Sequence, residues 1–360
     1  MLIENNVSLK PFNTFKVDVI AKYFAEVADL SELKELLDDK NYISEKRLIL
    51  GGGSNILFTK DFDGIVIKLN NSEIEKFHET DEEIFIKADA GVEWDSFVKY
   101  CVDNGLSGVE NLSLIPGNVG AAPIQNIGAY GVEVKDIIDS VSGLMCNSGY
   151  FITIPNNHCN FEYRNSIFKN ELKNEFVITS VLFKLPKQKK VNLNYAPLNN
   201  YFSGKKKSEI TSKNVRKAVI SIRKSKLPDP KILGNAGSFF KNPIISKEKY
   251  EQLISEYSDL NGYPESETSI KISAGWLIEQ CGLKGKRIGN VGVHEKQALV
   301  IVNYGNATGN EIVEFSKMIQ NEVKNKFNTT KGNHRTAPYD DLKKVITTKY
   351  KGYVGYYVSI

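Results

Sequence analysis

The sequence predicts a mixed fold of the α+β or α/β class, and three observations support this prediction. Helical and strand patterns alternate along the 360 residues, with no internal repeat and no low-complexity stretch. Hydrophobic residues make up 41% of the chain and charged residues 25%, the balance of a globular protein long enough for two or three domains. No apolar run approaches the roughly 20 residues that cross a bilayer, so we expect no membrane segment.

Apolar periodicity defines the elements of the first half of the chain. A helix is expected from Ser31 because Leu33, Leu36 and Leu37 recur at helical spacing. A second helix over 93–103 carries Trp94, Phe97, Val98 and Cys101 on one face and ends at Gly105 as its C-cap. The expected strands are 48–50, 64–69, 84–88, 137–145 and 176–185.

The second half follows a connector rich in lysine after Pro186, which predicts a domain boundary within 186–210. The expected helices are 214–224, 247–257, 274–280 and 310–326, with a strand at 298–302 between the last two. This half therefore predicts a further α+β unit.

Charge and metal-ligand spacing exclude two function classes. The net charge is +4, and residues 328–360 alone carry six basic and two acidic side chains, so the rest of the chain is neutral and no nucleic-acid partner is expected. The four cysteines and four histidines lack ligand spacing, so we expect no metal. The first residues, 1–6, lack the features of a secretory signal, which favours a cytoplasmic location.

A glycine loop, formed by Gly51, Gly52, Gly53, Ser54 and Asn55, follows the strand at 48–50. Consecutive glycines allow positive φ and expose backbone amides, which together suit a diphosphate. The spacing is not that of a Rossmann fingerprint, and no helix is expected behind it. Taken alone, a tight strand connection explains this loop as well as phosphate binding does.

A second loop, over 114–131, is unusually rich in small residues. Four glycines or prolines fall in its first ten residues, and three small residues surround Tyr130. Ordinary turns do not need this composition, so the loop predicts backbone wrapped against a large planar or phosphorylated ligand. The two loops together indicate a cofactor site.

Two polar residues in the later loops have alternative explanations. Arg164, between aromatic residues, is either a carboxylate clamp or a structural guanidinium, and the residues alone favour the structural role. Ser238, between Gly237 and Phe239, is either a turn hydroxyl or a reactive group. No histidine or acidic residue lies near it in sequence, so the residues give little support to a hydrolase triad.

The order and spacing of these motifs resemble the UDP-N-acetylenolpyruvoylglucosamine reductase (MurB) family, in its longer, type I branch. The similarity spans most of residues 5–328. It rests on the segments 10–15, 51–55, 115–131, 163–168, 226–231, 234–243, 274–278 and 294–299.

The resemblance implies an α+β fold in which a two-subdomain FAD-binding region of the PCMH type, over about 15–187, precedes an α+β substrate domain. The implied divisions are 1–70, 71–187, 188–327 and a divergent tail at 328–360. FAD would be noncovalent, because neither loop contains cysteine or histidine. By this likeness FAD would contact Gly51, Gly52, Gly53, Ser54, Asn55, Ile115, Pro116, Gly117, Gly120, Ala121, Pro123, Asn126, Gly128, Ala129, Tyr130 and Gly131.

The resemblance also implies the reaction, the reduction by NADPH of the enolpyruvyl ether of a UDP-sugar in peptidoglycan precursor synthesis. Arg164 would stabilise the carboxylate and the developing enolate, and Ser238 would deliver a proton to C2. Tyr195 matches a mobile tyrosine that covers the nucleotide. The implied substrate contacts are Tyr163, Tyr195, Lys226, Asn242, Tyr263 and Gln297. A monomer with a small-molecule substrate is expected.

The C-terminus departs from the family pattern. Family members end in a strand that supplies a catalytic glutamate, whereas no glutamate occurs over 328–360. An ungapped continuation places His334 at the glutamate position. A change of reading frame or natural divergence near residue 328 explains such a replacement.

Two alternatives to an active reductase remain open at the level of the sequence. One is another PCMH-type FAD oxidase or dehydrogenase, which would lack a uridine nucleotide site and leave Tyr195, Lys226 and Gln297 without a role. The other is a binding remnant that retains FAD and the UDP-sugar but has lost turnover with the glutamate.

Overall fold

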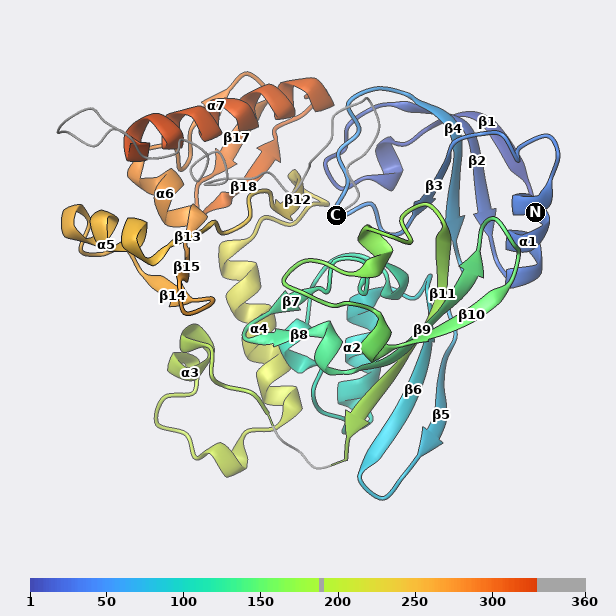
Figure 1. The fold of residues 1–360 in the computed structure, drawn as a ribbon, viewed down its shortest axis with the longest axis horizontal. Coiled ribbons are helices and arrows are strands. Elements are labelled where there is room, and N and C mark those ends of the chain that lie inside the picture. The colour runs from blue at the N-terminus through green and yellow to red at the C-terminus, as the bar shows by residue number, and fades with distance from the viewer. Residues whose placement is uncertain (188–190, 329–360) are drawn as a thin grey trace.

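The computed structural model describes residues 1–187 and 191–328. Its strands form sheets of four, five, four, three and two strands, with helices packed between and around them (Figure 1). Short 3-10 helices connect many of these elements. They are Lys10–Phe12, Glu110–Leu112, Val119–Ala121, Val134–Asp136, Asn156–His158, Ile167–Lys169 and Lys207–Glu209.

The N-terminal sheet has the strand order β1-β2-β4-β3 and is mixed. Its strands are β1 (Ile3–Ser8), β2 (Ile20–Val27), β3 (Arg47–Leu50) and β4 (Phe62–Leu69), with helix α1 (Leu30–Asp38) between β2 and β3. Strands β2 and β3 both run parallel to β4. Asp29 caps α1 by accepting hydrogen bonds from the backbone of Ser31 and Glu32. The glycine loop leaves the C-terminal end of β3.

The second sheet is antiparallel, with the strand order β10-β9-β11-β6-β5. Its strands are β5 (Ile74–Glu79), β6 (Glu83–Asp89), β9 (Ile138–Met145), β10 (Phe151–Pro155) and β11 (Phe176–Pro186). Helix α2 (Trp94–Asp103) packs on one face of this sheet. The rings of Phe97 and Phe183 join α2 to β11, with centroids 4.3 Å apart. The small hairpin of β7 (Gly128–Ala129) and β8 (Val132–Glu133) belongs to the loop after α2.

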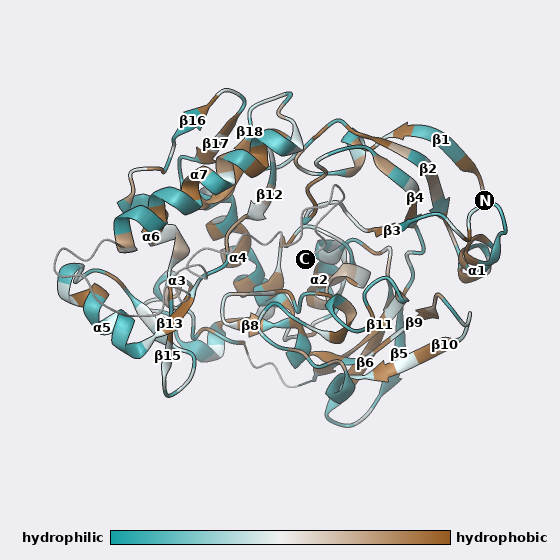
Figure 2. Ribbon diagram, turned by 45° about the horizontal axis from the view of Figure 1, so that its top comes forward, coloured by the Kyte–Doolittle hydropathy of each residue, from teal (hydrophilic) through white to brown (hydrophobic). Residues whose placement is uncertain are grey.

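The C-terminal part contains two sheets, of orders β12-β18-β17-β16 and β13-β15-β14. Its strands are β12 (Gly234–Ser238), β13 (Ile244–Ser246), β14 (Gly262–Pro264), β15 (Ser269–Ile272), β16 (Arg287–Ile288), β17 (Val291–His294) and β18 (Gln297–Asn303). Its helices are α3 (Ala196–Tyr201), α4 (Ser212–Lys226), α5 (Lys247–Glu256), α6 (Ala274–Gln280) and α7 (Gly309–Asn328). Polar and apolar residues alternate along α7, which lies against β17 and β18 (Figure 2).

The largest hydrophobic cluster joins the two ends of the described chain, because buried residues from 9–66 pack with buried residues from 236–327. The rings of Phe15 and Phe239 meet at a centroid distance of 6.1 Å. The side-chain amide of Asn303 donates to the carbonyl oxygen of Phe15 at 2.8 Å. This packing fixes β12, and with it Ser238, close to the N-terminal sheet.

The predicted elements are confirmed, with ends that differ by one to a few residues. The predicted faces are confirmed too, since Leu33, Leu36 and Leu37 are buried. Gly105 terminates α2 with φ +76°. Several strands were not predicted, among them β5, whose residues are largely exposed and polar, and β12, whose sequence is rich in glycine. The predicted domain divisions stay a prediction.

None of the helices in the described part of the chain combines the length and apolarity that a membrane span needs.

Candidate active site

Two adjoining cavities share the loop after α2 as a wall. One lies between this loop, the N-terminal sheet and β11, and the other lies between this loop and the C-terminal part. We name them the glycine-loop cavity, which contains the loop at 51–55, and the serine cavity, which contains Ser238. The residues that line both are Ser54, Asn55, Ile115, Pro116, Gln125 and Ile127. A long ligand can therefore extend from one cavity into the other.

The glycine loop offers unpaired backbone donors. Within residues 1–187 and 191–328, the N–H groups of Gly52, Gly53 and Ser54 have no hydrogen-bond acceptor. A Cβ on Gly52 would lie 2.9 Å from Oδ1 of Asn118 and 3.0 Å from Cα of Gly117. The two loops therefore approach one another as closely as glycine permits, which leaves their backbone accessible to a ligand.

The loop at 114–131 is fixed to the second sheet by its backbone. Val119 and Gly120 donate to the carbonyl oxygens of Val92 and Ala90 at 2.8 and 3.0 Å. A Cβ on Gly120 would lie 2.6 Å from Cβ of Ala90, so this position requires glycine. These contacts hold the wall of both cavities rigidly.

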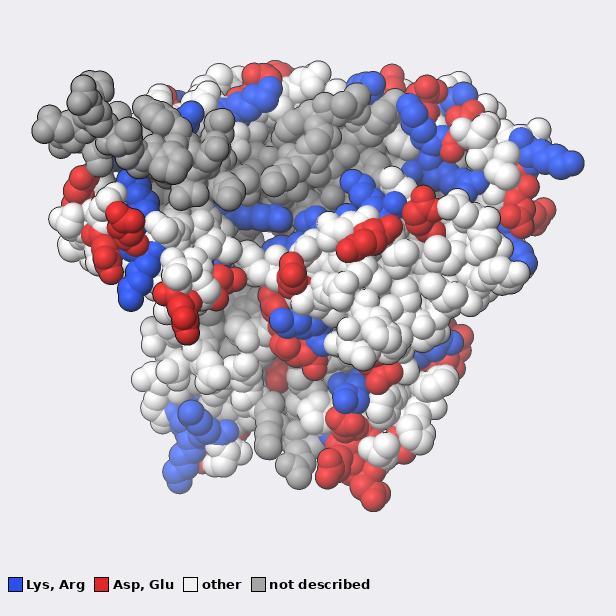
Figure 3. Space-filling model, viewed as in Figure 1, with Lys and Arg blue, Asp and Glu red and all other residues white. Residues whose placement is uncertain are grey.

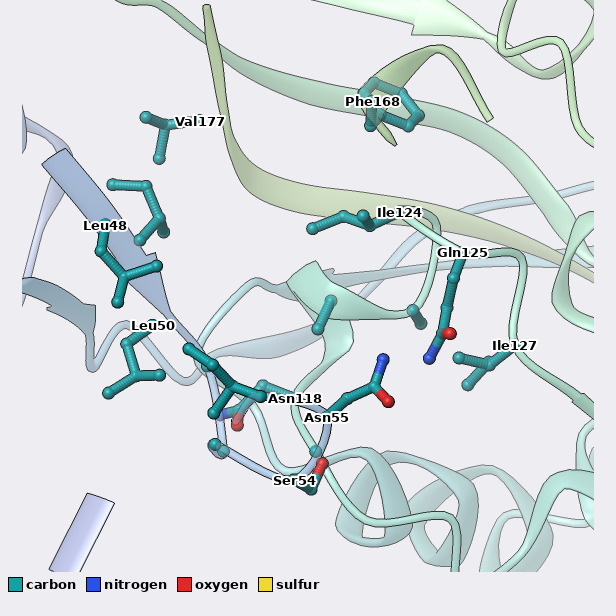
Figure 4. Close-up of a pocket in the computed structure, with 18 of the residues that line it drawn as sticks. Leu48, Leu50, Ser54, Asn55, Asn118, Ile124, Gln125, Ile127, Phe168 and Val177 are labelled. Carbon is teal, nitrogen blue, oxygen red and sulfur yellow. The ribbon is translucent and has the colours of Figure 1, made fainter. Parts of the chain in front are cut away.

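The glycine-loop cavity has a polar and an apolar end, as Figure 4 shows. The side chains of Asn55 and Gln125 extend toward one another, with Ser54 below them, whereas Leu48 and Val177 stand at the far side of the cavity. An apolar slot beside exposed amides suits a ligand that combines an aromatic ring with an anionic group.

These features fit FAD. The three unpaired amides supply anion-binding donors, the glycines leave room for a diphosphate, and the apolar walls suit planar rings. Cys101 and Cys159 are buried in the second hydrophobic cluster. All four cysteines are free thiols, and none comes from the glycine loop or from 115–131.

Arg164 lines the serine cavity, and two hydrogen bonds fix the orientation of its guanidinium. Its Nη1 donates to the carbonyl oxygen of Asn126 at 3.0 Å, and its Nη2 donates to that of Gly128 at 2.6 Å. Its backbone has φ +57°, a conformation that side-chain-bearing residues rarely adopt. Among the described residues Arg164 has no ion pair, so its positive charge is available to an anion in the cavity.

Ser238 lies in the same cavity at the end of β12. A bulge between Asn235 and Ser238 interrupts the pairing of β12 with β18, and Gly237 takes φ +65°. The backbone N–H of Phe239 donates to the carbonyl oxygen of Leu299 at 2.7 Å, which holds the strand in place beyond the bulge. The fold therefore brings a serine hydroxyl and an unneutralised arginine into one cavity.

Three of the six predicted substrate contacts line the serine cavity, namely Tyr163, Tyr195 and Asn242. The ring of Tyr195 meets that of Tyr130 edge to face, with centroids 5.5 Å apart. Lys226, Tyr263 and Gln297 do not line either cavity. Lys226 ends α4, Tyr263 is exposed on β14, and Gln297 begins β18.

The predicted cofactor residues divide similarly. Those that line one or both cavities are Gly51, Gly52, Gly53, Ser54, Asn55, Ile115, Pro116, Gly117, Ala121 and Gly128. Those that do not line these two cavities are Gly120, Pro123, Asn126, Ala129, Tyr130 and Gly131. Asn126 is buried and shapes the loop, because its side chain donates to Glu162 and Glu133.

Sequence reasoning missed several residues of the serine cavity, of which Arg223 and Lys241 are charged. Arg223 follows Val215 and Val219 at intervals of four on α4, and both valines are fully buried. A cation on an apolar helical face was the signal that could have identified it. Lys241, Asn118 and Gln125 lie inside recognised motifs and carried no separate signal.

The serine cavity is electropositive. Arg164, Arg223 and Lys241 line it, and no acidic side chain is among its described lining residues. Lysine and arginine side chains gather near the centre of the face shown in Figure 3. Lys169 donates to the carbonyl oxygen of Arg164 at 3.0 Å. Burial, together with the charges of Lys241, Lys173 and Arg164, lowers the pKa of Lys169 to about 7. The cavity therefore suits an anionic ligand.

Within the described residues no three histidine, cysteine or acidic side chains gather as a metal site would require. His334, at the predicted position of the family glutamate, lies with the rest of the tail at 329–360 outside the described residues.

Comparison with known proteins assigns both parts of the chain. Residues 21–154 match the model of an FAD binding domain, and residues 229–330 match the C-terminal domain of UDP-N-acetylenolpyruvoylglucosamine reductase. The reductase of Flavobacterium johnsoniae is 50% identical over 90% of this chain and 96% of its own length. The reductase of Neisseria gonorrhoeae is 45% identical over 88% and 92%.

A solved structure agrees with this assignment. The reductase of Thermus caldophilus superimposes with a TM-score of 0.65 at 25% identity and covers 89% of this chain and 96% of its own. The α+β architecture is therefore that of an FAD-binding part followed by the reductase C-terminal part. With two family models in the expected order and relatives up to 50% identical along nearly their whole length, the chain belongs to the UDP-N-acetylenolpyruvoylglucosamine reductase family.

Proposed function

We propose that this oxidoreductase uses noncovalent FAD and NADPH to reduce UDP-N-acetylenolpyruvoylglucosamine to UDP-N-acetylmuramate, in peptidoglycan precursor synthesis. The observation that carries the proposal is the joint position of Arg164 and Ser238 in the serine cavity, which adjoins the glycine-loop cavity. The named activity of the relatives supports the same substrate. In this reaction a hydride adds to C3 of the enolpyruvyl group and a proton adds to C2.

Bound FAD supplies the hydride relay from NADPH to the substrate. The residues that would hold it are those of the glycine loop, whose free amides suit the diphosphate, together with the wall from Ile115 to Gly128. The glycine-loop cavity lies between β3 of the N-terminal sheet and β11 of the second sheet, whose apolar side chains would cover part of the bound ligand.

Arg164 stabilises negative charge in this scheme. Two backbone carbonyls hold its guanidinium, so little reorganisation is needed when the substrate carboxylate takes on enolate character. The remaining N–H donors of the side chain are free to face the carboxylate.

Ser238 donates the proton from its Oγ to C2 of the substrate. The bulge at Gly237 and the hydrogen bond at Phe239 fix its backbone, which orients the hydroxyl. Asn242 and Tyr195, in the same cavity, would position the nucleotide sugar, with Lys226, Tyr263 and Gln297 completing its binding surface.

The absence of the family glutamate from 328–360 predicts a slower second half of the reaction. Reduction of the cofactor by NADPH does not use that acid, whereas stabilisation of the developing enolate does. We further propose a cytoplasmic monomer, with domain divisions at residues 70, 187 and 327.

The test is to purify the chain, record the visible flavin spectrum and follow NADPH absorbance after UDP-N-acetylenolpyruvoylglucosamine is added. We expect flavin bands and substrate-dependent loss of NADPH. Ser238→Ala and Arg164→Lys should each lower kcat about 10²- to 10³-fold while the flavin bands remain. Ser255→Ala, an exposed serine on α5, is the matched control. A chain without flavin, or turnover unaffected by either variant, would contradict the proposal.

A further inference from the structure

A second arginine, Arg223 on α4, lines the serine cavity. Arg223 lies in the last turn of α4 and lines the cavity together with Tyr195 and Leu227. Its Nε is shielded from solvent and has no hydrogen-bond partner among the described residues. A buried donor without a partner is rare, and a ligand bound in the cavity can supply the acceptor that this Nε lacks.

Within the described part of the chain, no carboxylate forms an ion pair with Arg223. The nearest acid to influence it is Asp95, whose two oxygens are bound by Arg216 at 2.6 and 2.8 Å. Asp95 also accepts the backbone N–H of Leu114 at 2.5 Å. The Asp95–Arg216 pair is neutral as a unit, so Arg223 contributes one uncompensated positive charge to the cavity wall.

Arg223 instead interacts with a neutral hydroxyl. Its guanidinium and the hydroxyl of Tyr130 interact electrostatically, and burial raises the pKa of Tyr130, which keeps that hydroxyl protonated. Tyr130 belongs to the loop at 114–131 and takes φ +52°, and its carbonyl oxygen accepts from Asn111 at 2.9 Å. The charge on α4 is thereby tied to the loop expected to contact the cofactor.

Cofactor reduction changes the charge that this wall faces. When FAD takes up a hydride, two electrons and one proton enter, so the bound cofactor gains one net negative charge. A fixed, poorly solvated cation beside the cavity favours the more negative form.

We propose that Arg223, oriented by Tyr130, compensates the charge of the reduced cofactor and raises the reduction potential of bound FAD. This inference rests on the proposed function for the presence of FAD. The competing role for the same cation is to bind the diphosphate of the substrate. Charge compensation changes the reduction potential of bound FAD, whereas a diphosphate contact changes the affinity for UDP.

The test compares Arg223→Gln and Arg223→Lys with wild type in the FAD-loaded protein. The midpoint potential is measured without substrate, and the binding of UDP is measured separately by calorimetry. We expect Arg223→Gln to weaken binding of reduced FAD relative to oxidised FAD about tenfold, which lowers the potential by about 30 mV for a two-electron couple. Arg223→Lys should recover most of this shift, and Tyr130→Phe should show part of it.

Lys217→Gln is the matched control, because it removes an exposed cation from the same helix. An unchanged potential with weakened UDP binding would overturn the proposal in favour of a diphosphate contact. An unchanged potential with a lower Tm would assign Arg223 a structural role in α4. Because the potential needs no substrate, a wild-type protein that holds FAD but does not turn over would contradict the proposed function alone.

Discussion

Arg164, which lines the serine cavity, and Lys169, which contacts Arg164, both donate to backbone carbonyl groups. Arg164 donates to two carbonyls of the loop at 114–131, and Lys169 donates to the carbonyl of Arg164 itself. The last contact supports the left-handed backbone of Arg164, a conformation that costs roughly 1–2 kcal/mol outside glycine. Because no acidic side chain among the described residues pairs with Arg164, its guanidinium stays available to a ligand, and the neighbouring cations repel one another.

This repulsion predicts a pH dependence of stability. Burial and neighbouring cations lower the pKa of Lys169 from 10.5 to about 7, so between these values the unfolded chain binds a proton that the folded chain does not. The free energy of unfolding should therefore gain from this group as pH rises from about 7 towards 10. Lys169→Met should remove that gain in urea titrations at several pH values.

Lys99→Met, on the exposed side of α2, is the control for this titration and should leave the slope unchanged. An identical pH slope in wild type and Lys169→Met would show that Lys169 keeps its proton in the folded protein.

A glycine position gives a second prediction at this scale. Gly53 has φ +60°, and a Cβ there would lie 1.9 Å from the carbonyl oxygen of Phe12, whereas Gly105 has φ +76° and open space around it. Gly105→Ala should lower the free energy of unfolding by only about 1–2 kcal/mol, the cost of placing alanine in a left-handed backbone conformation. Gly53→Ala should cost more and should also lower the FAD content of the purified protein, as measured by the ratio of flavin to protein absorbance.

Equal losses of stability in the two alanine variants, with FAD retained in both, would contradict the close packing at Gly53.

Between elements, the most consequential contact is the Asp95–Arg216 pair, which joins α2 to α4. Burial tends to raise the pKa of Asp95, but the hydrogen bonds from Arg216 and Leu114 outweigh it, and the net pKa is lowered. The contribution of this carboxylate to stability is therefore present above pH 4 and is lost as pH falls below its ordinary value.

Asp95→Asn should lower the free energy of unfolding by about 1.5–3 kcal/mol, because it removes the charge from two hydrogen bonds and leaves Arg216 without its counter-ion. Urea denaturation at pH 7 measures this loss. Asp103→Asn breaks an exposed pair with Lys99 on the same helix and should cost under about 1 kcal/mol. If both variants lose a similar free energy of unfolding, the partly buried Asp95–Arg216 pair stabilises the protein no more than the exposed pair does.

At the scale of the whole molecule, the two cavities lie where distant parts of the chain meet. FAD that binds there should stabilise the folded protein, by about 2.7 kcal/mol at one hundred times its Kd. UDP added to the FAD-loaded protein should raise Tm further, because the serine cavity combines Tyr195, Asn242 and uncompensated cations. Differential scanning calorimetry with FAD removed, restored and supplemented with UDP tests both steps.

AMP at the same concentration is the control ligand for the second step. Stabilisation by FAD with no added effect of UDP would favour the FAD oxidase or dehydrogenase alternative, which has no uridine nucleotide site.

Local periodicity determined most of the helices and the central strands from the sequence alone. The face of α1 and the end of α2 at Gly105 follow from neighbouring residues, which is why both were predicted correctly. Strands such as β5 and β12 were not predicted, because exposed polar or glycine-rich segments become strands only when a neighbouring strand pairs with them.

The sequence also determined the motifs that fix the family, and the chemical type of the glycine loop. Only the tertiary structure decided which of those motifs share a cavity. Phe15 packs against Phe239, which brings the two ends of the described chain together and places Ser238 beside Arg164. The tertiary structure likewise turned Arg223 into a cavity residue, because a cavity is formed by contacts between segments far apart in the chain, and local sequence carries no record of them.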